Sequence, residues 1–101
     1  MVTVSWAEPA LADLASIAEY IALDNPDAAS RFVARVFEAV DQLESFPHSG
    51  RHPPEMPHSE YRELIVTPCR VFYRATDKAV LILHVMRSER LLNLFLLDER
   101  G

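Results

Sequence analysis

An Asn-Pro pair at Asn25 and Pro26 divides the first half of the sequence into two amphipathic segments. Before the pair, apolar residues recur every three or four positions, at Leu11, Leu14, Ala18, Ile21 and Ala22. After the pair, the same spacing predicts a second apolar helix face, made by Phe32, Val33, Val36, Phe37, Val40 and Leu43. Because Asn25 can cap a helix with its side-chain oxygen and Pro26 suits a first helical turn, the two segments predict a helical hairpin.

Strand-like sequence lies on both sides of this hairpin. Val2 to Trp6 alternates and is rich in β-branched residues, which predicts a first strand. The proline-rich stretch from Pro47 to Ser59 predicts a long loop. Three further runs follow at Tyr61–Val66, Cys69–Ala75 and Ala79–Arg87, and their short connections favour an antiparallel meander. Residues 1–101 therefore predict one α+β domain, in which an N-terminal strand, a helical hairpin and a three-stranded antiparallel meander form one sheet packed on the helices.

Composition favours a globular protein of the cytoplasm. Half of the residues are hydrophobic and a quarter are charged, which is ordinary for a folded domain. Cys69 has no second cysteine with which to form an internal disulfide, which fits a reducing compartment. The first ten residues carry no basic side chain, and no apolar run approaches the roughly 20 residues of a membrane span. We therefore expect neither secretion nor a contact with the membrane.

Charge is unevenly distributed along the chain, whose formal net charge is −5. From Met1 to Glu44 there are eight acidic residues and two basic ones, whereas Arg62 to Arg90 holds six basic residues and three acidic ones. The positive charge is thus concentrated in the predicted strands. Two explanations stay open: a basic binding surface, or arginines that merely offset an acidic helix face.

The third predicted strand has the most distinctive pattern. Side chains alternate between the two faces of a strand, so Arg70, Phe72 and Arg74 share one face. Two guanidinium groups beside an aromatic ring suit an acidic peptide, a phosphate backbone or a stacked base. The alternative is that these arginines pair across strands with Glu63 or Asp77.

The last strand offers a candidate acid or base. His84 shares a face with Met86, and Leu83, Val85 and Arg87 share the other. A histidine beside Arg87 and Arg90 suits RNA cleavage, because imidazole can transfer protons near neutral pH while arginines stabilise phosphate charge. The alternative is a hydrogen-bonded core histidine.

Metal and cofactor sites are not predicted. The loop histidines His48, His52 and His58 have no spacing typical of a metal site. With two glycines in the chain, no glycine-rich nucleotide-binding loop can form.

Three stretches taken in order resemble the RelE/ParE superfamily of type II toxins: LADLASIAEYIALDNPDAASRF, LESFPHSGRHPPE and YRELIVTPCRVFYRATDKAVLILHVMRSER. They cover most of the chain between Val4 and Arg90. The more specific parts are Phe46-Pro47, Gly50-Arg51, the Tyr61-Arg62-Glu63 start and the strand Arg70 to Arg74.

The resemblance implies a small cytosolic toxin that a cognate, ParD-like antitoxin neutralises by wrapping it. ParE-like members poison DNA gyrase without an active site of their own, whereas RelE-like members cut messenger RNA in the ribosome. We favour ParE-like action, because the tail from Leu91 to Gly101 has no lysine, histidine or tyrosine and the net charge of −5 opposes an approach to phosphates.

The expected sites follow from that choice. A ParE-like toxin has no catalytic residue, no cofactor and no sequence-specific nucleic-acid site of its own. For the RelE-like alternative, the catalytic set is His84, Arg87 and Arg90. For antitoxin binding, we expect a patch on the sheet made by Arg62, Arg70, Phe72, Tyr73, Arg74, Arg87 and Arg90. The conformation of residues 91–101 is left open.

Overall fold

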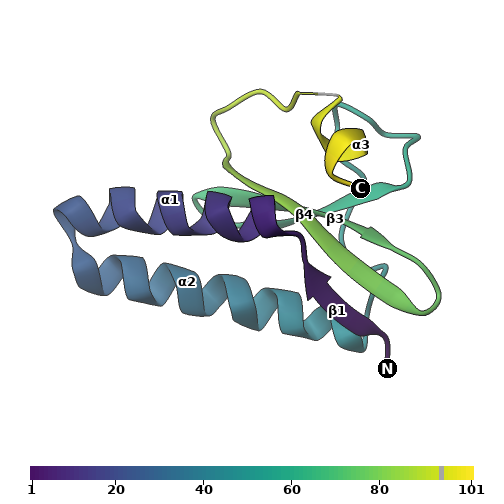
Figure 1. The fold of residues 1–101 in the computed structure, drawn as a ribbon, viewed down its shortest axis with the longest axis horizontal. Helices are drawn as coiled ribbons and strands as arrows, with labels where there is room; N and C mark the ends of the chain where they lie inside the picture. Colours follow the sequence, from purple (N-terminus) through teal and green to yellow (C-terminus); the bar gives the residue numbers. More distant parts are fainter. Residues whose placement is uncertain (94) are drawn as a thin grey trace.

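The computed structural model, which describes residues 1–93 and 95–101, contains one four-stranded sheet. The strands are β1 (Thr3–Trp6), β2 (Tyr61–Val66), β3 (Cys69–Ala75) and β4 (Ala79–Arg87), in the spatial order β1-β4-β3-β2. The antiparallel pairing of β2 with β3 and of β3 with β4 confirms the predicted meander. β1 lies beside β4 in parallel, so the first and last strands of the chain are neighbours (Figure 1).

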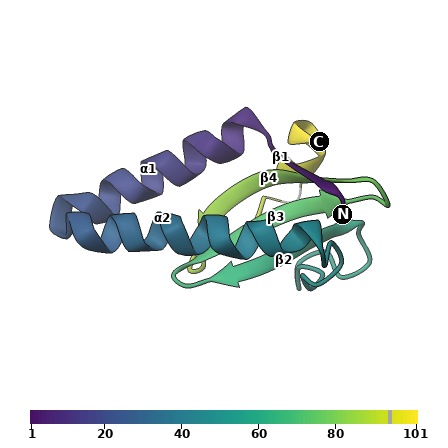
Figure 2. The same ribbon diagram turned by 90° about the horizontal axis from the view of Figure 1, so that it is seen from below.

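Two helices form the predicted hairpin on one face of this sheet (Figures 1 and 2). They are α1 (Glu8–Asp24) and α2 (Pro26–Asp41), and a short 3₁₀ turn, Gln42–Glu44, extends α2. Asn25 caps α2 as predicted, because its side-chain oxygen accepts a hydrogen bond from the backbone N–H of Ala28 at 3.0 Å. The far end of the hairpin projects beyond the sheet (Figure 2).

The buried stripe of α1 is rotated from the predicted one. Leu14 is buried as expected, but its buried companion is Ala10, and Leu11 is 43% exposed. Ile17 and Ile21 pack against the core from the same stripe, at the spacing of successive helical turns. The error arose because alanines occur on several sides of α1, so the apolar pattern did not define one face.

The sheet has an apolar core on each face. On the helix side, Phe32, Val36 and Val40 of α2 pack with Val80, Ile82 and Val85 of β4. On the opposite side, Phe72 of β3 and Leu83 and Met86 of β4 form a second cluster. The prediction that the last strand is apolar on both faces is therefore confirmed, and both faces are covered.

The C-terminal segment provides the second cover. It folds back across the sheet and ends in α3 (Leu96–Arg100), which lies on the side opposite the helical hairpin (Figure 1). Leu92 and Leu97 are its buried anchors, with exposed fractions of 6% and 0%. Two leucines thus hold a segment that is too short to be a stable helix by itself.

A register shift in β4 changes the face of the sheet on which one side chain lies. The pairing between β3 and β4 moves from Phe72 opposite His84 to Tyr73 opposite Ile82. Leu83 therefore has no partner opposite it in β3 and forms a β-bulge. Leu83 consequently packs on the tail side, as do Phe72 and Met86. The prediction that Leu83 faces away from His84 was wrong, because simple alternation does not anticipate a bulge.

Candidate functional site

Arg70 does not lie on an open basic face. Its guanidinium group donates to both carboxylate oxygens of Glu55, at 2.6 and 2.7 Å, and to Glu63 at 2.6 Å. The Arg70 side chain is 9% exposed and that of Glu63 is 0% exposed. The alternative of cross-strand pairing with Glu63 is the one that the structure contains, and the charge of Arg70 is used inside the fold.

The other predicted residues of β2 and β3 also make internal contacts. Phe72 and Tyr73 are fully buried, one on each side of the sheet. Arg62 donates to the backbone carbonyls of His48 and Gly50 at 3.1 and 2.8 Å, which fixes the proline-rich loop. Arg74 donates to the carbonyl of Gly101 at 3.0 Å. In this conformation the loop and the tail cover Arg70 and Phe72 on one face of the sheet, and Tyr73 is buried on the other face, so these residues form no open patch. Their contact with an antitoxin stays a prediction.

Arg87 and Arg90 lie elsewhere, on the side of α1. Arg87 pairs with Glu89 at 2.6 Å, and its guanidinium carbon lies 5.4 Å from the ring centroid of Tyr20 on α1. Arg90 is exposed just beyond the end of β4. The structure therefore separates the predicted arginines into two groups, which do not form one patch.

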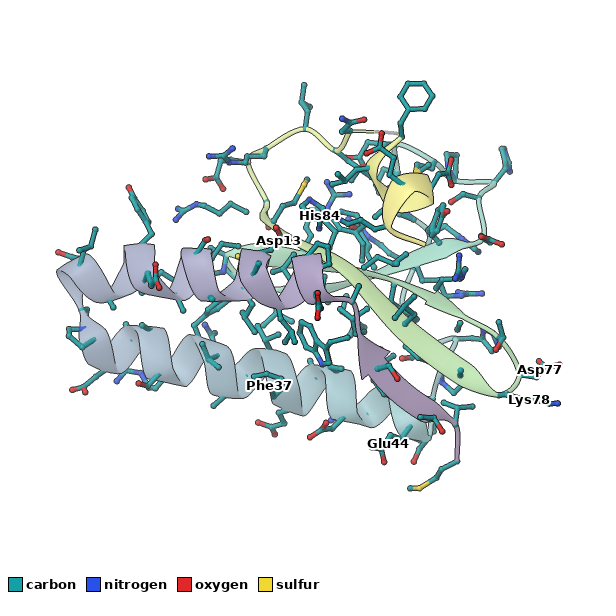
Figure 3. All side chains as sticks on the ribbon, in the orientation of Figure 1. Asp13, Phe37, Glu44, Asp77, Lys78 and His84 are labelled. Atoms are coloured by element: carbon teal, nitrogen blue, oxygen red, sulfur yellow. The ribbon has the colours of Figure 1, made fainter. Side chains whose placement is uncertain are left out.

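His84 belongs to a polar cluster with Asp13 of α1 and Arg100 of α3. Its Nδ1 lies 2.6 Å from Oδ2 of Asp13, and the same oxygen accepts from Nη1 of Arg100 at 2.6 Å. Nη1 of Arg100 also donates to the carbonyl of Leu83 at 3.0 Å. Both hydrogens of that arginine nitrogen are used in this way. We therefore assign the ring hydrogen of His84 to Nδ1, where it is donated to Asp13, and this leaves Nε2 as the nitrogen able to exchange a proton. Figure 3 shows Asp13 and His84 meeting between α1 and β4.

This cluster stabilises the charged form of Asp13. Burial by itself would raise the pKa of Asp13, but hydrogen bonds from His84, Arg100 and the backbone N–H of Val85 outweigh it and lower that pKa. The ring of His84 stacks on Phe72, with centroids 5.8 Å apart and planes inclined by 18°. The imidazole therefore has a fixed orientation, with a carboxylate on one nitrogen.

A groove opens beside this cluster. Its volume is about 620 Å³, and it is lined by α1 between Asp13 and Tyr20, the end of β4 and the segment that follows β4. His84, Arg87 and Arg90, the residues predicted for the ribonuclease alternative, all line it. These three residues were predicted from the sequence, whereas Asp13 and Arg100 were not. Asp13 lies one helical turn before Ile17, and this spacing was the sequence signal that could have placed it near the core. Arg100 had no such signal, because α3 was not predicted.

The described residues contain no group of three histidine, cysteine, aspartate or glutamate side chains that could hold a metal ion. Of the loop histidines, His52 bonds through Nδ1 to the carbonyl oxygen of Tyr61 at 2.9 Å. Burial raises the pKa of Cys69 to about 11, so its thiol stays protonated at neutral pH. Within residues 1–93 and 95–101, none of the helices has the length and apolar character to cross a membrane.

The chain is similar to proteins that are named as toxins and to a solved toxin-antitoxin structure. Toxin RelE2 of Caulobacter vibrioides is 37% identical over 92 residues, which cover 90% of this chain and 100% of that protein. The Y4kP protein of Sinorhizobium fredii is 39% identical, over 86% of this chain and 88% of its own. A solved structure of the chromosomal ParDE system of P. aeruginosa has a chain that superposes with a TM-score of 0.72 at 28% identity, over 88% of this chain and 98% of the other.

The family model described as the ParE toxin of the type II toxin-antitoxin system parDE matches residues 4–92. Because that match covers most of the sequence, the chain belongs to the ParE toxin family of type II toxin-antitoxin systems.

Proposed function

We propose that this toxin acts in the cytoplasm by binding and poisoning DNA gyrase, and that a ParD-like antitoxin neutralises it. Membership of the ParE family supports the gyrase target, and a type II system implies an antitoxin as partner. In this mechanism the toxin is a protein ligand that blocks another enzyme. Its own side chains provide contacts and no chemistry.

The observation that carries this proposal is the state of the arginines around His84. Arg100 is the guanidinium in contact with His84, and Asp13 neutralises it at 2.6 Å. Arg87, which lines the same groove, is paired with Glu89. A nuclease needs unpaired positive charge beside its acid or base to hold the scissile phosphate. Here two of the three guanidinium groups are already neutralised, in a chain whose net charge is −5.

RNA cleavage in the ribosome is the second candidate. Two observations favour it: a 37% identical relative carries the name RelE2, and Asp13 fixes the Nδ1 side of His84 while Nε2 stays available for proton transfer. In that case His84 would be the acid or base, and Arg87 and Arg90 would have to contact the phosphate.

Two assays with the same purified toxin distinguish the candidates. One measures supercoiling of relaxed plasmid by DNA gyrase with ATP, and the other measures the integrity of a messenger RNA on translating ribosomes. We expect supercoiling to stop while the messenger RNA stays intact. Intact supercoiling together with cut messenger RNA would replace the gyrase proposal by the ribonuclease.

A further inference from the structure

The connection between α1 and α2 forms a hollow at the end of the hairpin that projects beyond the sheet (Figure 2). Its volume is about 560 Å³, and it is lined by the last turn of α1 and the first turn of α2. Two large apolar side chains of its wall lie mostly in solvent, because Leu23 is 86% exposed and Tyr20 is 65% exposed. We call the surface made by Tyr20, Leu23, Asp24 and Asp27 the hairpin tip.

Leu23 has no place in the core of this fold. The side chains that pack α1 on the sheet follow one stripe, which contains Leu14, Ile17 and Ile21. Leu23 comes two residues after Ile21, and two residues turn a helix by about 200°. Its side chain therefore points away from the sheet, and a partner is needed to bury Leu23 together with Tyr20.

Negative charge borders these apolar side chains. Asp24 ends α1, Asp27 lies in the first turn of α2, and both are exposed. Among residues 1–93 and 95–101, neither carboxylate forms an ion pair. The stretch from Glu19 to Arg31 has three acidic residues and one basic residue. The hairpin tip is thus an apolar surface with a negative border.

This combination selects the kind of partner. An enzyme that holds DNA presents positively charged side chains towards the phosphates. DNA gyrase, the proposed target, therefore has the charge that complements Asp24 and Asp27, and a carboxylate at the border of an apolar contact can pair with arginine or lysine. A second copy of this chain is a poorer match, because each copy carries a net charge of −5.

We propose that the hairpin tip is the surface by which this toxin contacts DNA gyrase, with Leu23 as its apolar contact and Asp24 and Asp27 paired with basic side chains of gyrase. This inference rests on the proposed function, since gyrase is the partner that it names. It assigns the gyrase contact to the helical hairpin, whereas every site residue predicted from the sequence lies on β2, β3 or β4 or directly after β4.

The test measures the amount of each purified variant that halves the supercoiling of relaxed plasmid by gyrase with ATP. Leu23→Gln and Asp24→Lys should each raise that amount at least about tenfold, and Asp24→Glu, which keeps the charge, should leave it within about twofold. Both tip variants should fold, because glutamine and lysine are good helix formers and a lysine in the last turn of α1 interacts favourably with the helix dipole.

Two matched controls lie at the other end of α2. Glu44→Lys reverses an exposed charge there, in the short turn that extends α2 (Figure 3). Phe46→Gln replaces an apolar side chain that is 64% exposed. Both controls should inhibit gyrase as the unchanged chain does.

Calorimetry with the protein encoded by the adjacent reading frame separates gyrase from the antitoxin as the occupant of the tip. The affinity for that protein should stay within about threefold in Leu23→Gln and Asp24→Lys. A loss of this affinity in variants that still inhibit gyrase fully would assign the tip to the antitoxin and overturn the proposal.

Failure of this inference is distinguishable from failure of the proposed function. Full inhibition by both tip variants would overturn the inference alone, and so would equal losses in the controls. Absence of inhibition by the unchanged chain would overturn gyrase as the target, and the inference with it.

Circular dichroism of each variant shows whether it is folded. A variant that fails to fold is replaced by a photo-crosslinking residue at Leu23, whose 86% exposure accommodates it. Crosslinking from this position to a gyrase subunit supports the surface. Crosslinking to gyrase only from a probe placed at Phe46, or crosslinking only between two toxin copies, contradicts it.

Discussion

Arg100 and Asp13 lie 87 residues apart in the chain, yet their side chains meet at 2.6 Å. This ion pair joins the last helix to the first one, beside Leu83 and His84 in the middle of β4. It also orients His84, which lines the groove beside α1 together with Asp13. A contact between two distant parts of the sequence therefore shapes this groove.

Loss of this ion pair should loosen the tail. Arg100→Met keeps the apolar stem but leaves the half-buried Asp13 without its guanidinium partner, so we expect a loss of about 1–2 kcal/mol in the free energy of unfolding. Amide hydrogen exchange should also become faster in residues 91–101. Urea unfolding and exchange mass spectrometry measure the two effects.

The control is Arg87→Met, which removes an exposed pair between residues two positions apart and should leave the free energy of unfolding nearly unchanged. Equal losses for Arg100→Met and Arg87→Met would show that the tail is not held by Arg100.

Glu55 should make stability depend on acid pH. Its hydrogen bonds with Arg70 lower the pKa of Glu55 from 4.5 to about 2. A carboxyl group whose pKa is lowered by folding stabilises the folded state above its ordinary pKa, and this contribution disappears as the pH falls through the lowered value. Glu55→Gln should therefore cost about 1–2 kcal/mol at pH 7, since the site is partly solvated.

The difference between Glu55→Gln and the unchanged chain should shrink steadily as the pH falls from 4.5 towards 2. Urea unfolding at several pH values measures it, with Glu60→Gln as the control, because Glu60 is 63% exposed and lies 3.8 Å from Arg74. A difference that stays constant with pH would contradict the assigned role of Arg70.

Gly50 should tolerate no side chain. A Cβ atom there would lie 2.6 Å from the hydroxyl of Tyr73 and 2.7 Å from the backbone oxygen of Glu63, well inside contact distance. The N–H of Gly50 also donates to that buried hydroxyl at 2.9 Å. Gly50→Ala should therefore cost about 1–3 kcal/mol in thermal or urea unfolding. His48→Ala, an exposed change in the same loop, should be nearly neutral, and a neutral Gly50→Ala would mean that the loop does not pack on Tyr73 as described.

His84→Asn separates the structural role of the histidine from a chemical one. The asparagine amide can replace the Nδ1–H donor towards Asp13, but it has no counterpart of Nε2. Gyrase inhibition should persist at full strength, because the proposed mechanism uses no proton transfer. A loss of toxicity in a variant with native circular dichroism and native melting temperature would favour the ribonuclease alternative.

Much of the fold follows from local sequence signals. The bounds of β2, β3 and β4 agree with the prediction because each strand ends at a turn residue, and Asn25 caps α2 because its side chain acts within three residues. The parallel pairing of β1 with β4 has no local signal, since it joins segments more than 70 residues apart.

The site could be predicted less well, and for the same reason. Arg70 was assigned to an open face because alternation along β3 gives its direction but not what covers it. The cover is the loop that carries Glu55 and the tail that carries Leu97, which are distant in sequence. Asp13 and Arg100 were missed because their pairing depends on where the tail ends.

The most direct test of the central claim is a plasmid cleavage assay with purified DNA gyrase, ATP, supercoiled plasmid and increasing amounts of the toxin. We expect linear plasmid to accumulate as the toxin traps gyrase on broken DNA, and added antitoxin to abolish the linear product. Normal gyrase turnover and no linear plasmid, at a large excess of toxin shown to be folded, would contradict gyrase as the target.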